Sequence, residues 1–242
     1  LKNSCPSNRH FCDFLISYKY EVRSMNEVIG KTYSIIADNP TVKGCTVSKQ
    51  VLNTAHLGIY YFSLAENTDI SAESYGYHKL ILVADGTAEV YTNDNRSWDL
   101  VSGQAVLTPL DVPVGIRTQS GAIYTEIGFG KETVMNNIIN PGEVFALKDL
   151  LPVQDGKIVN MDVAHNDKMK FVLMSFSAGT GLAEHAAPGD ALIFALEGEG
   201  IIGYEGTEHK IKAGENFRFA KNGRHSVTAV SDFKMALLLT LE

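Results

Sequence analysis

Residues 181–200 read GLAEHAAPGDALIFALEGEG and carry the most information about the architecture of this chain. The apolar run 191–196 ends at Glu197-Gly198, and an acidic residue before glycine favours a hairpin turn because glycine tolerates a positive φ. A further glycine-punctuated segment begins at Gly214. Short apolar runs with turns at a spacing of about 8–12 residues are typical of β-sandwiches and barrels. This half of the chain is therefore predicted to be all-β.

The same arrangement occurs twice. At an offset of 112 residues, Asp85-Gly86 in the first half meets Glu197-Gly198 in the second, and further along the offset falls to 111. The period is too long for a solenoid repeat, so it indicates one small domain that has been duplicated. We predict two domains, over residues 25–135 and 136–242, with a turn at each of the two glycines.

Two segments lie outside this pattern. Residues 1–24 carry a net charge of +2 and two of the three cysteines. We interpret them as an N-terminal arm that packs on a neighbour, as an added segment, or as the product of a start upstream of Met25. A short helical segment is expected either near the N-terminus or between the two copies, where Glu143–Leu151 is predicted to form it.

Composition excludes several classes of protein. Hydrophobic residues make up 45% of the 242 residues and charged residues 20%, which suits a folded domain with a real core. The formal charge of −7 argues against non-specific binding to nucleic acid or to an anionic membrane. No apolar run reaches the roughly 18 residues that a membrane span needs. Three cysteines do not make a disulfide framework and fit a reducing compartment, so we expect a cytoplasmic protein.

The glycines and histidines of the second copy resemble two motifs of the cupin superfamily. The segment 181–200 resembles the first motif, G-x5-H-x-H-x3,4-E-x6-G, and GENFRFAKNGRH, from Gly214 to His225, resembles the second, G-x5-P-x-G-x2-H. The first copy keeps the same frame more faintly, in Asp85-Gly86 and in residues 103–114. The resemblance covers about residues 25–242. It implies two tandem cupin barrels, of the jelly-roll or double-stranded β-helix type.

The resemblance also implies a metal site inside each barrel. A cupin metal is typically held by two histidines and a glutamate from the first motif and by one histidine from the second. In the second copy His185 and His225 are present, but Ala187 and Ala191 occupy the other two positions. A divalent transition metal (Fe, Mn, Zn or Ni) would be held by the two histidines, with waters or Asp190 completing its shell.

The first copy offers no such ligands. The four matching positions hold Glu73, Tyr75, Lys79 and Val114. We therefore expect no metal in the N-terminal barrel. Tyr75, Tyr77 and His78 are expected to fill the space that a metal would occupy, which would make this barrel a structural partner of the other.

Two hypotheses for the function follow. In the first, the C-terminal barrel binds a small polar molecule, an organic acid or a sugar, through His185, His225, Phe194, Tyr204 and Phe219. In the alternative, the chain is a metal-dependent isomerase, decarboxylase or dioxygenase that uses the two histidines, which titrate near neutral pH. A weaker third view is a purely structural pair of barrels. The resemblance also leaves open a homodimer, because cupins commonly pair through sheet edges.

Overall fold

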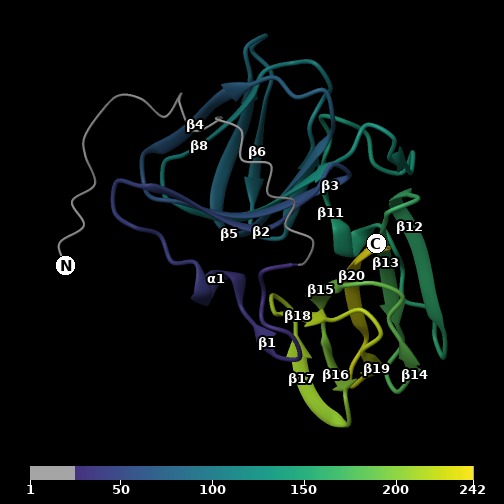
Figure 1. The fold of residues 1–242 in the computed structure, drawn as a ribbon. Helices are drawn as coiled ribbons and strands as arrows, with labels where there is room; N and C mark the ends of the chain where they lie inside the picture. The colour runs from purple at the N-terminus through teal and green to yellow at the C-terminus, as the bar shows by residue number, and fades with distance from the viewer. Residues whose placement is uncertain (1–24, 242) are drawn as a thin grey trace.

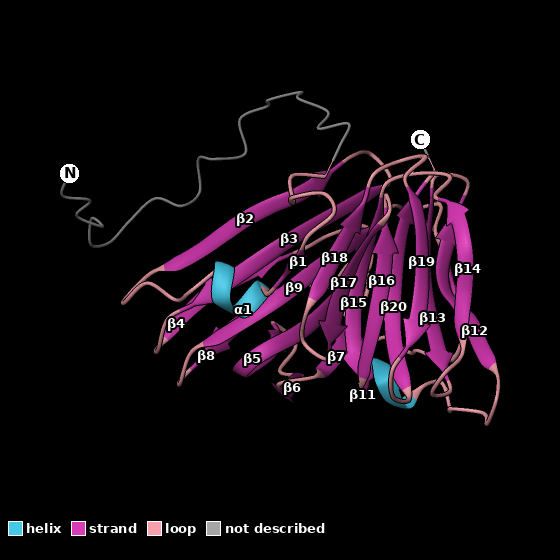
Figure 2. Cartoon of the chain, turned by 90° about the horizontal axis from the view of Figure 1, so that it is seen from below, coloured by secondary structure: helices cyan, strands magenta, loops and turns pink. Residues whose placement is uncertain are grey.

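Almost all regular structure in the chain consists of antiparallel strands (Figure 2). A computed structural model describes residues 25–241, so the predicted arm over residues 1–24 lies outside the described residues. The first half contains β2 (Thr46–Asn53), β3 (Leu57–Leu64), β4 (Thr68–Glu73), β5 (Lys79–Thr92), β6 (Ser97–Val101), β7 (Gln104–Leu107), β8 (Val114–Thr118) and β9 (Ala122–Phe129).

The second half repeats this set of strands. It contains β12 (Ile158–Asn166), β13 (Met169–Phe176), β14 (Gly181–Ala186), β15 (Ala191–Glu197), β16 (Glu199–Tyr204), β17 (Thr207–Lys212), β18 (Asn216–Phe219), β19 (Arg224–Ala229) and β20 (Phe233–Thr240). The connecting elements are β1 (Thr32–Tyr33), α1 (Ile35–Asp38), β10 (Val134–Met135), β11 (Val144–Ala146) and the 3₁₀-helix η1 (Leu147–Asp149).

The two halves form two barrels with the same strand pairing. In the second, the sheet β1-β18-β15-β20-β13-β12-β10 is accompanied by the four-stranded sheet β14-β19-β16-β17. In the first, the order β11-β7-β5-β9-β3-β2 repeats the larger sheet, while β4, β8 and β6 repeat the smaller one. The long strand β5 takes part in both, so the first barrel counts as a single nine-stranded sheet. The predicted all-β fold of two barrels is confirmed.

The turns predicted at the two repeated glycines are wrong. Strand β5 runs straight through Gly86, which still pairs with Ala122 of β9 before the next residues pair with β6. In the second barrel, β15 ends and β16 begins at Gly198, but the two strands belong to different sheets. At both glycines the chain therefore crosses from one sheet to the other instead of folding back. The acidic-Gly dipeptide correctly predicted a positive φ at each glycine, but it wrongly predicted that the chain forms a hairpin turn there.

The predicted helix at Glu143–Leu151 is also wrong in large part. Residues Val144–Ala146 form β11, and only Leu147–Asp149 turn as a 3₁₀-helix. Strand β11 lies antiparallel to β7, with Val144 opposite Val106, and this pairing draws the segment into an extended form. Within residues 25–241, no helix has the length and apolar character to cross a lipid bilayer.

Each barrel receives its edge strand from the segment that precedes the other. Strand β1 pairs with β18, with Thr32 opposite Phe217, and Figure 1 shows it leaving the first half of the chain to lie beside the second barrel. Its counterpart 112 residues later is β11, which pairs with β7 of the first barrel. Each barrel thus contains residues from both sides of position 135. The domain limits 25–135 and 136–242 stay a prediction.

Alternation along the strands divides the buried side chains into three cores. On β15, Ile193 faces the interior of the second barrel, whereas Leu192 and Phe194 face the first barrel. On β9, Tyr124 faces the interior of the first barrel, whereas Ile127 contributes to the core that the barrels share. Because successive side chains of a strand point to opposite faces, the parity of a residue decides which core it joins.

Candidate functional site

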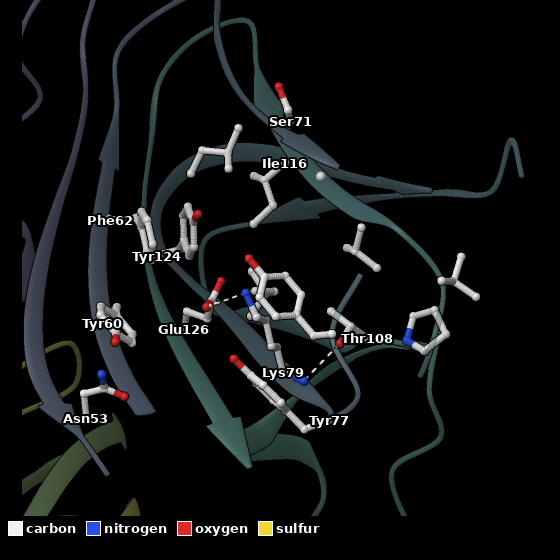
Figure 3. Close-up of a pocket in the computed structure, with 17 residues that line it drawn as sticks. Asn53, Tyr60, Phe62, Ser71, Tyr77, Lys79, Thr108, Ile116, Tyr124 and Glu126 are labelled. Carbon is white, nitrogen blue, oxygen red and sulfur yellow. Dashed lines mark hydrogen bonds and ion pairs between the residues drawn. The ribbon is translucent and has the colours of Figure 1, made fainter. Parts of the chain in front are cut away.

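The first barrel contains a cavity of about 390 Å³ (Figure 3). Five aromatic side chains contribute to its wall: Tyr60, Phe62, Tyr75, Tyr77 and Tyr124. Polar groups come from Asn53, Ser71, Lys79, Thr108 and Glu126. An apolar wall with a few placed polar groups is the usual composition of a small-molecule site, and this volume lies near the lower end of the usual range of about 300–1,000 Å³.

A buried ion pair lies in this cavity. Lys79 Nζ on β5 is 2.8 Å from Glu126 Oε1 on β9, and each side chain is only 12% exposed. Both side chains point to the inner face of adjacent strands. Lys79 lies two residues before Ile81, on the same face of β5, and Ile81 is directly opposite Glu126 on β9. Lys79 Nζ also lies 3.4 Å from the centre of the Tyr75 ring, a cation–π contact. The strand register therefore holds a cation and an anion side by side against an aromatic face.

The tyrosines of the cavity act as neutral hydroxyl groups. Burial is the main cause that raises the pKa values of Tyr60, Tyr75 and Tyr77, and nearby carboxylates add to the effect. Tyr75 also donates a 2.6 Å hydrogen bond to Glu73 Oε2, which raises its pKa further because the bond favours the protonated phenol. These phenols keep their protons at neutral pH and can donate hydrogen bonds.

This cavity corrects the sequence-based view of the first barrel. Tyr75 and Tyr77 were expected to fill the space of a metal site, yet they line an open volume. His78 does not line it, and its Nδ1 bonds the carbonyl oxygen of Thr108 at 2.7 Å. Of the four positions that match cupin metal ligands, Tyr75, Lys79 and Val114 line the cavity, and Glu73 is bonded to the first of them. The cavity therefore lies where the cupin pattern has its metal site, but the side chains at the ligand positions differ from those of that pattern.

Sequence reasoning missed Glu126, Tyr60 and Tyr124. A usable signal was present, since Glu126 is the single charged residue in the apolar segment Ala122–Phe129. Burying a lone carboxylate is costly unless a partner compensates it, so its presence predicts a buried cation nearby. The partner, Lys79, lies 47 positions earlier, and only the pairing of β5 with β9 brings it close.

The predicted histidine pair of the second barrel does assemble. His185 on β14 lies directly opposite His225 on β19, with ring centroids 4.2 Å apart. The His225 ring also stacks on Phe219 at 4.1 Å, and Phe219 contacts Tyr204 at 5.5 Å. Four of the residues predicted to bind a ligand thus form one continuous aromatic cluster. Burial lowers the pKa of His225, with a smaller contribution from His185.

Both histidines are held in the same tautomer. His185 Nδ1 bonds the carbonyl oxygen of Ala183 at 2.9 Å, and His225 Nδ1 bonds that of Gly223 at 3.1 Å. A carbonyl oxygen can only accept, so each neutral ring carries its proton on Nδ1. The Nε2 lone pairs remain available to accept a hydrogen bond or to ligate a metal.

Two other predicted site residues lie elsewhere. Asp190 accepts a 2.9 Å hydrogen bond from Arg218 Nη2 on one carboxylate oxygen and another from the backbone N–H of Lys221 on the other. Phe194 is buried in the core between the barrels, because its parity on β15 points it away from the second barrel's interior. The structure therefore does not bring Asp190 or Phe194 to the histidine pair.

The second barrel does not fit the complete metal site of the cupin pattern. Among the described residues, no group of three or more His, Cys, Asp or Glu side chains could hold a metal ion. Ala187 and Ala191, at the two missing positions, are buried methyl groups that supply no donor. The remaining carboxylate beside His185, Glu184, is paired with Arg224. Two imidazoles alone fall short of the three protein ligands usual for catalytic zinc.

Comparison with known proteins agrees with the architecture. The Cupin domain family matches residues 172–241. Among solved structures, the Cupin 2 conserved barrel domain protein from Leptotrichia buccalis has a TM-score of 0.78 and 26% sequence identity, covering 89% of this chain and 99% of that one. No curated protein matches the chain.

A second structural neighbour is more distant. The salicylate 1,2-dioxygenase from Pseudaminobacter salicylatoxidans has a TM-score of 0.58 and 13% identity, covering 79% of this chain and 75% of that one. At this identity the likeness concerns the fold alone. Together the repeated barrels and the family match define a cupin-fold protein. The match to the Cupin domain family lies within the second barrel.

Proposed function

We propose that this chain binds a small polar organic molecule, and that the binding site is the cavity of the first barrel. The observation that carries the proposal is the cavity of about 390 Å³ with the buried Lys79–Glu126 pair on its wall. A buried ion pair is weak support for stability, because desolvation of both charges offsets most of their attraction. A role in binding the polar groups of a ligand accounts better for the position of this ion pair on the wall of a cavity.

This proposal keeps the predicted class of function and moves its location. The C-terminal barrel was the predicted binding barrel because it retains two histidines. Its His225 is packed between Phe219 and His185, so the faces of the His225 ring are already in contact with other side chains. The first barrel offers donors, acceptors and aromatic faces around an open volume.

The experiment compares two variants, each altered in one barrel. Val114→Trp places an indole into the first cavity, and His225→Ala opens the histidine cluster of the second barrel. Ligand-induced shifts in melting temperature are recorded for both variants and the parent with a panel of sugars, polyols and organic acids. We expect the shifts to vanish in Val114→Trp and to persist in His225→Ala. The reverse pattern would place the site in the second barrel and overturn the proposal. Far-UV circular dichroism verifies that both variants are folded.

The alternative function is a metal-dependent enzyme centred on His185 and His225. One observation favours it, namely that both Nε2 atoms are free of the hydrogen bonds that fix the rings. The incomplete donor set argues against it. Elemental analysis of the purified protein distinguishes the two functions, as set out in the Discussion.

A further inference from the structure

The charges that face the cavity of the first barrel cancel. Among the lining residues, Lys79 is the basic group and Glu126 the acidic group, and they are 2.8 Å apart. The tyrosines of the wall are phenols that are neutral at neutral pH, and burial raises the pKa values of Tyr60 and Tyr77 further. A bound carboxylate would add a second negative charge close to Glu126, and a bound amine would compete with the ammonium group of Lys79. The electrostatics of the cavity therefore favour a neutral ligand.

The ion pair has unused hydrogen-bonding capacity. A lysine ammonium has three N–H donors, and an ionised carboxylate has about four acceptor sites. The contact with Glu126 uses one donor, and the contact with the Tyr75 ring faces another. One donor of Lys79 and most acceptor sites of Glu126 remain. A hydroxyl group suits both partners, since it donates to the carboxylate and accepts from the ammonium group.

Two hydroxyls on neighbouring carbon atoms match the pair in spacing as well. Their oxygens lie about as far apart as Lys79 Nζ and Glu126 Oε1. The aromatic wall then offers flat faces to the C–H groups of such a ligand, and the Tyr75 and Tyr77 rings meet at an angle of 55° with centroids 5.5 Å apart. Asn53 and Ser71 add further polar groups at the wall.

From this geometry we infer that the ligand of the first barrel is a neutral polyhydroxylated molecule of single-ring size, a monosaccharide or cyclic polyol, and that the Lys79–Glu126 ion pair reads two of its adjacent hydroxyls. The inference rests on the proposed function, because it names the ligand class of the same cavity. Organic acids of equal size are the class that it excludes.

The test uses matched pairs of probes that differ only in charge. D-glucose is compared with D-glucuronate, and D-galactose with D-galacturonate, and myo-inositol is added as a neutral polyol. Binding to the full chain is measured by saturation-transfer-difference NMR and calorimetry. We expect a neutral member to bind at least tenfold more tightly than its acid. A deoxy analogue that lacks one of the adjacent hydroxyls should lose at least tenfold in affinity, because it leaves a charged group without its partner.

The variants connect this preference to the ion pair. Lys79→Met/Glu126→Gln removes both charges together, so that neither is left uncompensated, and it should lower the affinity for the neutral sugar at least tenfold. The matched control is Lys234→Met/Glu197→Gln, which removes an ion pair of the second barrel and should leave the affinity unchanged. Equal losses in both double variants would overturn the role assigned to Lys79 and Glu126.

The outcomes separate this inference from the proposed function. Tighter binding of glucuronate or galacturonate than of the neutral sugars overturns the neutral-ligand inference, while Val114→Trp still shows whether the first cavity is the site. If neither sugars nor their acids bind, the inference also falls. The proposed function falls separately, if no member of the broader panel shifts the melting temperature in a way that Val114→Trp abolishes.

Discussion

Lys79 on β5 and Glu126 on β9 form a 2.8 Å ion pair inside the first barrel, and Lys79 occupies a position that would carry a metal ligand in the cupin pattern. In the first barrel, the ammonium group of Lys79 thus supplies a positive charge where the cupin pattern has a residue that binds a metal cation. The two barrels share one fold, but the same position holds Lys79 in the first and Ala191 in the second. The duplication has therefore produced two interiors of different chemistry.

The ion pair makes a prediction about stability. Lys79→Met leaves the carboxylate of Glu126 buried and alone, so it should lower the free energy of unfolding by about 3–5 kcal/mol. Lys79→Met/Glu126→Gln removes the uncompensated charge and should recover most of that loss. Urea denaturation followed by tyrosine and tryptophan fluorescence measures both. Equal losses in the single and the double variant would contradict the pairing.

A buried hydroxyl predicts a harmless substitution. The Tyr124 hydroxyl is fully buried and makes no hydrogen bond, whereas the equally buried Tyr61 hydroxyl bonds that of Tyr33 at 2.8 Å. Tyr124→Phe should leave the stability unchanged or raise it, because it removes an unsatisfied polar group. Tyr61→Phe is the matched control and should cost about 1 kcal/mol. Thermal and urea unfolding of both variants test this prediction. A larger loss of stability in Tyr124→Phe than in Tyr61→Phe would show that the Tyr124 hydroxyl has a hydrogen-bond partner.

The two crossover glycines should not tolerate a side chain. A Cβ at Gly86 would lie 2.1 Å from the carbonyl oxygen of Gly121, and one at Gly198 would lie 1.8 Å from that of Asp232. Gly86→Ala and Gly198→Ala therefore force backbone atoms apart and should each cost more than about 2 kcal/mol. Gly103 also has a positive φ but open space around it, so Gly103→Ala should cost only about 1 kcal/mol. Melting temperatures of the three variants test this order, and equal shifts would refute the close approach.

The buried histidine predicts a dependence of stability on pH. Burial lowers the pKa of His225, so the folded state favours the neutral ring and binds fewer protons than the unfolded state. This contribution to stability is complete above the unfolded pKa of about 6.5 and is lost as the pH falls through the folded value. His225→Leu should remove that part of the dependence, whereas His165→Gln, at an exposed position, should not.

The measurement is the free energy of unfolding of the three proteins between about pH 5 and 7, within reach of the ordinary histidine pKa. The difference between the parent and His225→Leu should shrink as the pH falls. A difference that stays constant over this range would show that the protonation of His225 is not linked to folding.

Metal content tests the alternative function. We expect less than stoichiometric transition metal in the purified protein after metal loading, because the described donor set ends at two imidazoles. His185→Ala/His225→Ala is analysed beside it by elemental analysis. One metal per chain that disappears in the double variant would revive the metal-dependent enzyme.

Local signals in the chain were sufficient for the architecture and for one cluster. The spacing of Gly181, His185 and His225 predicted the second barrel and the histidine pair, because the cupin motifs tie those residues to fixed strands. Phe194 was misplaced because its parity on β15 was not followed. Asp190 was assigned to a metal although it directly precedes Ala191, whose side chain faces the interior of the second barrel, so that alternation points Asp190 away from it.

The sequence by itself determined that this chain is a duplicated all-β protein, since glycine positions and apolar periodicity are local properties that repeat 112 residues apart. Only the tertiary structure decided which residues share a site. Lys79 and Glu126 meet through the register of β5 and β9, and Thr32 reaches Phe217 in the other barrel. Strand register and the exchange of edge strands depend on long-range pairing, which leaves no mark in the spacing of neighbouring residues.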